Sequence, residues 1–95
     1  MKKFLLLSYG FETPTPKIME AWNKWFASIK PSIVDMGHFR NGREISKSGT
    51  KDLTMGPDAI TGFVVVNANS FEEAEKMAQT NPYITSIRVY EMMSK

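Results

Sequence analysis

Cysteine is absent from the sequence, and histidine occurs once, as His38. Without cysteine the chain has no disulfides, no thiolate nucleophile and no cysteine ligands for zinc or iron–sulfur clusters. A single histidine adds little to a metal site that would otherwise consist of carboxylates. The composition therefore predicts a protein without a metal site, and it suits a reducing compartment.

Motifs for several enzyme classes are also missing. The sequence contains no Gly-x-Ser-x-Gly, no glycine-rich loop directly after a strand, and no lysine placed for a phosphate. These absences exclude serine hydrolases of that type, P-loop enzymes and dinucleotide-binding enzymes. We expect no organic cofactor.

Long hydrophobic runs are lacking as well. The apolar run Phe4-Leu5-Leu6-Leu7 follows two lysines but soon meets polar Ser8. A signal peptide needs an apolar region of roughly 7–15 residues, and a membrane span needs roughly 20. We therefore interpret the run as a strand and expect a cytoplasmic protein that does not enter a membrane.

Charges of the two signs nearly balance, because 12 lysine and arginine residues face 10 aspartate and glutamate residues, for a net charge of +2. Such a balance indicates no polyanionic partner. The 95 residues, 42% of them hydrophobic, suffice for one hydrophobic core but not for two. We expect a single domain over residues 1–95.

Three segments have clear β-strand patterns. Residues 4–9 and 61–68 are apolar or β-branched runs, which are typical of buried strands. Residues 85–93 alternate between apolar and polar side chains, as expected for a strand with one covered face.

A hairpin is predicted in the middle of the chain. Residues 33–40 have a strand pattern, and Asn41-Gly42 follows directly. Both central residues of a type I′ turn need positive φ, which asparagine and glycine tolerate. Residues 43–49 should then return antiparallel to the preceding strand, before a loop over residues 51–59 that lacks periodicity.

Two helices separate these strands. The first begins at Thr13 or Thr15, each an N-cap candidate followed by proline, and ends at Lys30-Pro31. The second begins at Ser70, which forms a capping box with Glu73. The apolar stripe of the first helix comprises Ile18, Trp22, Trp25, Phe26 and Ile29.

The order of elements predicts an α+β fold, a ferredoxin-like βαββαβ sandwich with an extra hairpin strand. Two helices can cover only one face of the sheet. The alternation predicts that the other face carries Leu5, Leu7, Tyr9, Val64, Val66, Arg88 and Tyr90. Because this face is too apolar to remain in water, we expect a second copy of the sheet to cover it in a homodimer.

Several short segments, in their order and spacing, resemble one known family. They are Tyr9-Gly10, Thr13-Pro14, Ala21-Trp22-Asn23-Lys24-Trp25-Phe26, Val34-Asp35-Met36-Gly37, Gly56-Pro57, Gly62-Phe63-Val64-Val65-Val66, Asn69-Ser70-Phe71-Glu72-Glu73-Ala74 and Ile87-Arg88-Val89. The family is that of the YCII-related or DGPF-domain proteins, and the resemblance covers nearly the whole chain. In the motif that names the family, Gly56-Pro57 remain, whereas Met55 replaces an acidic residue and Asp58 an aromatic one. The resemblance implies a dimeric α/β barrel.

Asp35 and His38 are the candidate catalytic residues. Histidine titrates near neutral pH, so an imidazole can exchange protons, and a carboxylate can orient it. The resemblance implies the same pairing, because some branches of the related superfamily are thought to use a His–Asp pair for chemistry without a cofactor. Residues three apart on a regular strand point to opposite faces, so the pair needs a bulge, most simply at Gly37. The alternative is that His38 only lies near the end of the hairpin.

Tyr9, Trp22, Arg88 and Tyr90 are the candidate ligand-binding residues. Trp22 belongs to the helical stripe, so it either lines a pocket or packs in the core. Arg88 lies with Tyr90 on an apolar sheet face, where a charge needs an acidic partner across a dimer or an anionic ligand. We expect a small aromatic or anionic molecule to bind between the sheet and the first helix, with a cofactor-independent reaction as one interpretation.

Two other functions are compatible with the predicted fold. One is a non-catalytic domain whose role is dimerisation itself. The other is RNA binding, because RNA-recognition motifs share the βαββαβ topology and Gly62-Phe63 matches part of their third-strand motif. Thr61 and Val65 stand where that motif has a basic residue and a stacking aromatic, so we expect no nucleic-acid partner.

Overall fold

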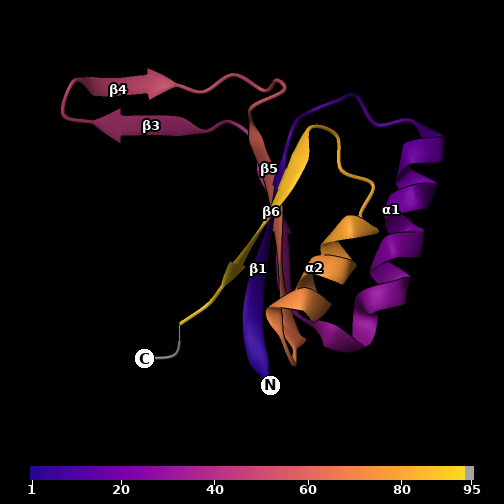
Figure 1. The fold of residues 1–95 in the computed structure, drawn as a ribbon. Coiled ribbons are helices and arrows are strands. Elements are labelled where there is room, and N and C mark those ends of the chain that lie inside the picture. The colour runs from indigo at the N-terminus through magenta and orange to yellow at the C-terminus, as the bar shows by residue number, and fades with distance from the viewer. Residues whose placement is uncertain (94–95) are drawn as a thin grey trace.

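An antiparallel sheet carries two helices on one of its faces (Figure 1). The computed structural model describes residues 1–93. Its main strands are β1 (Lys2–Tyr9), β2 (Ile33–His38), β5 (Ile60–Ala68) and β6 (Ser86–Glu91), and they lie in the order β2-β5-β1-β6. The helices are α1 (Pro16–Ile29), which continues into a 3-10 turn (Lys30–Ser32), and α2 (Phe71–Gln79). The predicted α+β class and βαββαβ order are confirmed.

Local capping explains where the helices begin. Of the two predicted N-caps of α1, the structure uses Thr15, whose hydroxyl accepts a hydrogen bond of 3.2 Å from the Ile18 amide. The Ser70 hydroxyl caps α2 in the same way, accepting from the Glu73 amide at 3.2 Å. The Glu73 carboxylate accepts from the Asn69 side-chain amide at 3.4 Å, so this carboxylate binds a side chain instead of completing a capping box. Within residues 1–93, neither helix is long and apolar enough to cross a bilayer.

The predicted hairpin is wrong in its pairing. Residues 43–46 form β3 (Arg43–Ser46), which pairs with β4 (Gly49–Asp52) and not with β2. Asn41 does adopt a positive φ of 59°, but this one left-handed residue turns the chain away from the sheet. Residues 47–48 connect β3 to β4, and β4 includes residues 51–52, which we predicted to be loop. This ribbon projects from the sheet on the side opposite the helices (Figure 1).

The hydrophobic core lies between the sheet and the helices. Phe4, Leu6 and Val66 are fully buried in it, and Trp25 and Ile29 of α1 pack against them. Val64 also belongs to this core.

The face predicted for Val64 and Val66 is therefore wrong. Leu6 pairs with Val64 and Phe4 with Val66, so both valines point toward the helices with their partners on β1. Phe63 and Val65 take their places on the opposite face, beside Leu7 and Leu5. A continuous β-branched run does not reveal which of its residues share a face with a neighbouring strand, because that depends on register. We call this opposite face, which the helices leave uncovered, the open face.

Trp25 is expected to contribute most of the stability that α1 draws from the sheet. Its side chain is 3% exposed, and its indole N–H donates to the Met77 carbonyl at 2.9 Å. Trp25→Ala should lower the free energy of unfolding by about 3–5 kcal/mol in urea titrations followed by circular dichroism. Phe26→Ala should lower it less, since Phe26 is partly exposed. A larger effect at Phe26 would contradict the observed orientation of α1, and the exposed control Lys24→Ala should have almost none.

Candidate functional site

A cavity of about 460 Å³ lies between α1 and the end of the sheet where β2 finishes and β5 begins. This volume falls within the range of about 300–1,000 Å³ that small-molecule sites occupy. α1 contributes Ile18, Met19, Trp22, Asn23 and Phe26 to the lining, and β5 contributes Thr61, Gly62, Phe63 and Val64. Residues 37–40 and the loops around residues 10–14 and 55 complete it.

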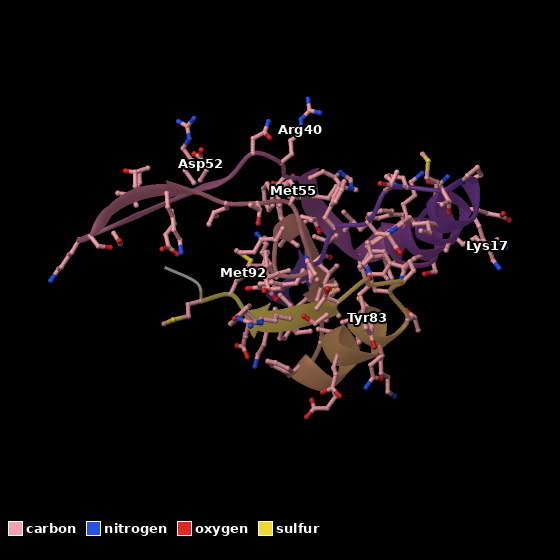
Figure 2. The ribbon with its side chains drawn as sticks, turned by 90° about the horizontal axis from the view of Figure 1, so that it is seen from above. Lys17, Arg40, Asp52, Met55, Tyr83 and Met92 are labelled. Atoms are coloured by element: carbon pink, nitrogen blue, oxygen red, sulfur yellow. The ribbon has the colours of Figure 1, made fainter. Side chains whose placement is uncertain are left out.

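Backbone hydrogen bonds hold the two loops of the cavity together. The Gly10 amide donates to the Ala59 carbonyl at 2.7 Å, and the Phe11 amide donates to the Gly56 carbonyl at 3.0 Å. Gly10 has a φ of 105°, and a Cβ there would approach Thr85 Oγ1 to 2.5 Å, so this turn requires glycine. These hydrogen bonds fix the loop that contains Gly56-Pro57, and they thereby hold Met55 in the cavity lining. Figure 2 shows Met55 on the same side of the molecule as Arg40, and Tyr83 lies on the other side.

A glycine makes room for a ring on the β2–β5 ladder. Gly37 pairs with Phe63, where an added Cβ would approach Phe63 Cε1 to 2.6 Å, so the absence of a side chain lets this ring lie against the backbone. His38 pairs with Gly62 on the other face of the ladder, where an added Cβ would lie 3.1 Å from the Gly37 carbonyl oxygen and 3.7 Å from His38 Cδ2.

Aromatic rings make up much of the cavity wall. Trp22 stacks on Phe26 with ring centroids 5.8 Å apart and an interplanar angle of 29°. Both residues line the cavity from α1, and their stacked rings form a wall that suits a flat, apolar ligand surface. Phe39 stacks on Phe63 at 5.6 Å and 16°, but Phe63 pairs with Leu7 and Gly37, so this second pair of rings lies on the open face.

A few polar side chains share the cavity with these rings. They are Ser8, Glu12, Asn23, His38, Arg40 and Thr61. None of the ion pairs found among residues 1–93 includes His38 or Arg40. In the same part of the chain no three His, Asp or Glu side chains gather into a group that could hold a metal ion. The guanidinium of Arg40 is therefore available to a ligand of opposite charge.

The structure does not bring Asp35 and His38 together. The irregularity in β2 lies between Ile33 and Asp35, so the bulge that we expected at Gly37 is absent from this described strand. From Asp35 to His38 the register is regular, and the two side chains leave the strand on opposite faces. The Asp35 carboxylate instead accepts a hydrogen bond of 2.8 Å from the Met36 amide.

Tyr9, Arg88 and Tyr90 meet on the open face, away from the helices. Leu7 pairs with Arg88 and Leu5 with Tyr90 across β1 and β6, as the predicted alternation requires. The Arg88 guanidinium lies over the Tyr9 ring, 4.4 Å from its centroid. A hydrogen bond with the Tyr90 side chain, and then the electrostatic influence of Tyr9 and Tyr90, raise the pKa of Arg88 above its ordinary value.

The six candidate residues thus divide between two places. His38 and Trp22 line the cavity, whereas Tyr9, Asp35, Arg88 and Tyr90 belong to the open face. Sequence reasoning missed Glu12 and Arg40 as site residues. Their place in the lining depends on how the loop after β1 meets the end of β2, which no local pattern in the sequence indicates.

Comparison with known proteins supports the fold. No family model matches the chain, and no curated protein matches it. Among the solved structures that are similar, one matches over 98% of this chain and 95% of its own, with a TM-score of 0.58 and 14% sequence identity. It is 5-chloro-2-hydroxyhydroquinone dehydrochlorinase (TftG) from Burkholderia phenoliruptrix AC1100 in complex with 2,5-dihydroxybenzoquinone. At this identity the likeness shows the fold alone, an α+β fold like that of TftG, and it does not show membership of the YCII-related family.

Proposed function

We propose that this protein binds a small, flat aromatic molecule that carries an acidic or hydroxyl group, and that it does so without a cofactor. The observation that carries this proposal is the cavity between α1 and the β2–β5 ladder, whose lining combines the stacked rings of Trp22 and Phe26 with His38 and Arg40. A concave apolar site with a few convergent polar groups is the usual form of a small-molecule site.

The ligand class follows from the chemistry of the wall. Stacked rings favour a flat π-system, because offset stacking adds about 0.5–1.5 kcal/mol per pair beyond the buried area. Arg40 supplies a positive charge and His38 a ring nitrogen, so an acidic or phenolic oxygen finds donors here. 2,5-Dihydroxybenzoquinone, which is bound to TftG, is a flat hydroxylated ring of this kind.

His38 acts in this proposal as a hydrogen-bonding partner of the ligand. Its ring lies beside Gly62, where no side chain separates it from the cavity. An acid–base role would need a group that orients the imidazole, and Asp35 lies on the other face. Glu12 is the one carboxylate among the described residues that line the cavity, so it replaces Asp35 as the candidate for that task.

Ligand binding can be measured by thermal shift. Wild-type protein should be stabilised by 2,5-dihydroxybenzoate and 2,5-dihydroxybenzoquinone more than by benzene or cyclohexanol. His38→Ala and Arg40→Ala should each weaken binding about tenfold or more, since a hydrogen bond to a charged group contributes about 1.5–3 kcal/mol. Arg43→Ala is the matched control, because Arg43 lies on the projecting ribbon and pairs with Asp52. Equal stabilisation of wild type and His38→Ala would remove His38 from the site.

Self-association is the second part of the proposal, and the open face supports it. Leu5, Leu7, Phe63 and Val65 lie there next to one another in the register, and both helices pack on the other side of the sheet (Figure 1). Burial of such a surface against a second copy removes apolar area from water at about 25 cal/mol per Å². The alternative to ligand binding is a non-catalytic domain whose role is assembly. Such a domain would form its homodimer through this same face.

The homodimer predicts twice the chain mass in light scattering at micromolar concentration. Leu7→Asp should dissociate it, because a carboxylate would be buried among apolar side chains of both copies. Ala27→Asp on the exposed surface of α1 is the control and should leave the mass unchanged. Val66→Asp is not an equivalent test, because Val66 is fully buried in the core and that change would unfold the protein. A monomer with a native spectrum would contradict the homodimer.

A further inference from the structure

We propose that Asp35 of each subunit forms an ion pair with the partner's Arg88, so that two reciprocal pairs fix how the open faces meet. The inference rests on the proposed homodimer and specifies its geometry. β2 and β6 are the two edge strands of the sheet. Within the described chain, Asp35 and Arg88 are the only charged residues that these strands place on the open face, and their charges are opposite.

The two residues lie at opposite edges of one face. The register runs from Asp35 on β2 through Val65 and Leu5 to Tyr90 on β6. The next row runs from Gly37 through Phe63 and Leu7 to Arg88. Apolar side chains therefore fill the middle of the face, with a negative charge at one edge and a positive charge at the other.

Neither charge finds an opposite charge in its own chain. None of the ion pairs among residues 1–93 includes Asp35 or Arg88. The Asp35 carboxylate accepts a hydrogen bond from the neighbouring Met36 amide, and the Arg88 guanidinium lies over the Tyr9 ring and forms a hydrogen bond with the Tyr90 side chain. Three inter-strand spacings of about 4.8 Å each put about 14 Å between β2 and β6, too far for a contact within one chain. When the face is covered, each charge loses water and needs a partner from the other copy.

A two-fold axis between two stacked faces lies parallel to them, and in two of its directions it aligns the strands of one copy with those of the other. If the axis runs across the strands, β2 lies over the partner's β2. The two Asp35 residues then meet at one edge of the interface, and the two Arg88 residues meet at the other edge. If the axis runs along the strands, β2 lies over the partner's β6, and Asp35 comes to the edge that holds Arg88 and Tyr90. Like charges on a covered apolar face are costly, whereas opposite charges are attracted. The charge distribution therefore selects the axis along the strands and makes the contact isologous.

Tyr90 strengthens this selection. It occupies the same row as Asp35, so its hydroxyl can donate to the partner's Asp35 beside the guanidinium. Buried ion pairs need such additional hydrogen bonds, and they contribute to orientation more than to net affinity. The apolar centre of the face then supplies affinity, and the two pairs supply register and direction.

A charge-reversal cycle tests the pair. The dissociation constant of the dimer is measured by sedimentation velocity over a dilution series for wild type, Asp35→Arg, Arg88→Asp and the double variant. Each single reversal places two like charges at both edges and should raise the constant by at least about tenfold. The double variant restores opposite charges and should return to within about threefold of wild type. Lys17→Asp on the far end of α1 is the matched control and should behave as wild type (Figure 2).

The outcomes separate this pair from the homodimer on which it rests. A wild type that stays monomeric at all concentrations overturns both. If wild type is dimeric and the single reversals dimerise equally well, the ion pair alone is overturned. The ion pair alone is also overturned if the double variant does not recover the dissociation constant of wild type. If circular dichroism shows that a reversal unfolds the chain, Asp35→Asn and Arg88→Gln replace it. In that cycle the double variant should be no weaker than either single, and additive losses would overturn the pair.

Discussion

The register between β1 and β5 is the constraint on which the rest of the structure depends. Leu6 opposite Val64 and Phe4 opposite Val66 place the buried residues of both strands on the face that receives the helices. A slip of one residue would turn this set toward the open face. Because β5 also pairs with β2, the same register decides where His38 and Asp35 emerge.

The site depends on this constraint through the β2–β5 ladder. Gly62 pairs with His38 on the helix side, so no side chain at residue 62 enters the cavity between the ladder and α1. Gly37 faces the Phe63 ring on the open face. Trp25 anchors α1 in the core, which leaves its neighbours Trp22 and Phe26 to form the opposite wall. Packing of the helix and pairing of the strands thus determine the cavity together.

Local features were predictable from the sequence, and features that depend on pairing were not. The caps at Thr15 and Ser70 and the shared face of Leu5, Leu7, Arg88 and Tyr90 follow from nearby residues or from strict alternation. The phase of the run at residues 63–66 could not be predicted, because every position there is apolar. Residues 43–46 would pair with β2 if Asn41-Gly42 made a tight turn. They pair with β4 because Asn41-Gly42 only bends the chain. The separation of Asp35 from His38 depended on where β2 bulges, which neighbouring residues alone do not decide.

The two faces of the sheet therefore have separate roles in this account: the helix side holds the ligand cavity, and the open face carries the charges that orient a second copy. The most direct test of the cavity uses the imidazole nitrogens of His38, which are unambiguous in NMR spectra because the chain has one histidine. During titration with 2,5-dihydroxybenzoate, these resonances should shift in a saturable manner, together with the indole resonance of Trp22. Saturable binding that leaves both unchanged, or the absence of binding by this and related aromatic acids, would contradict the account.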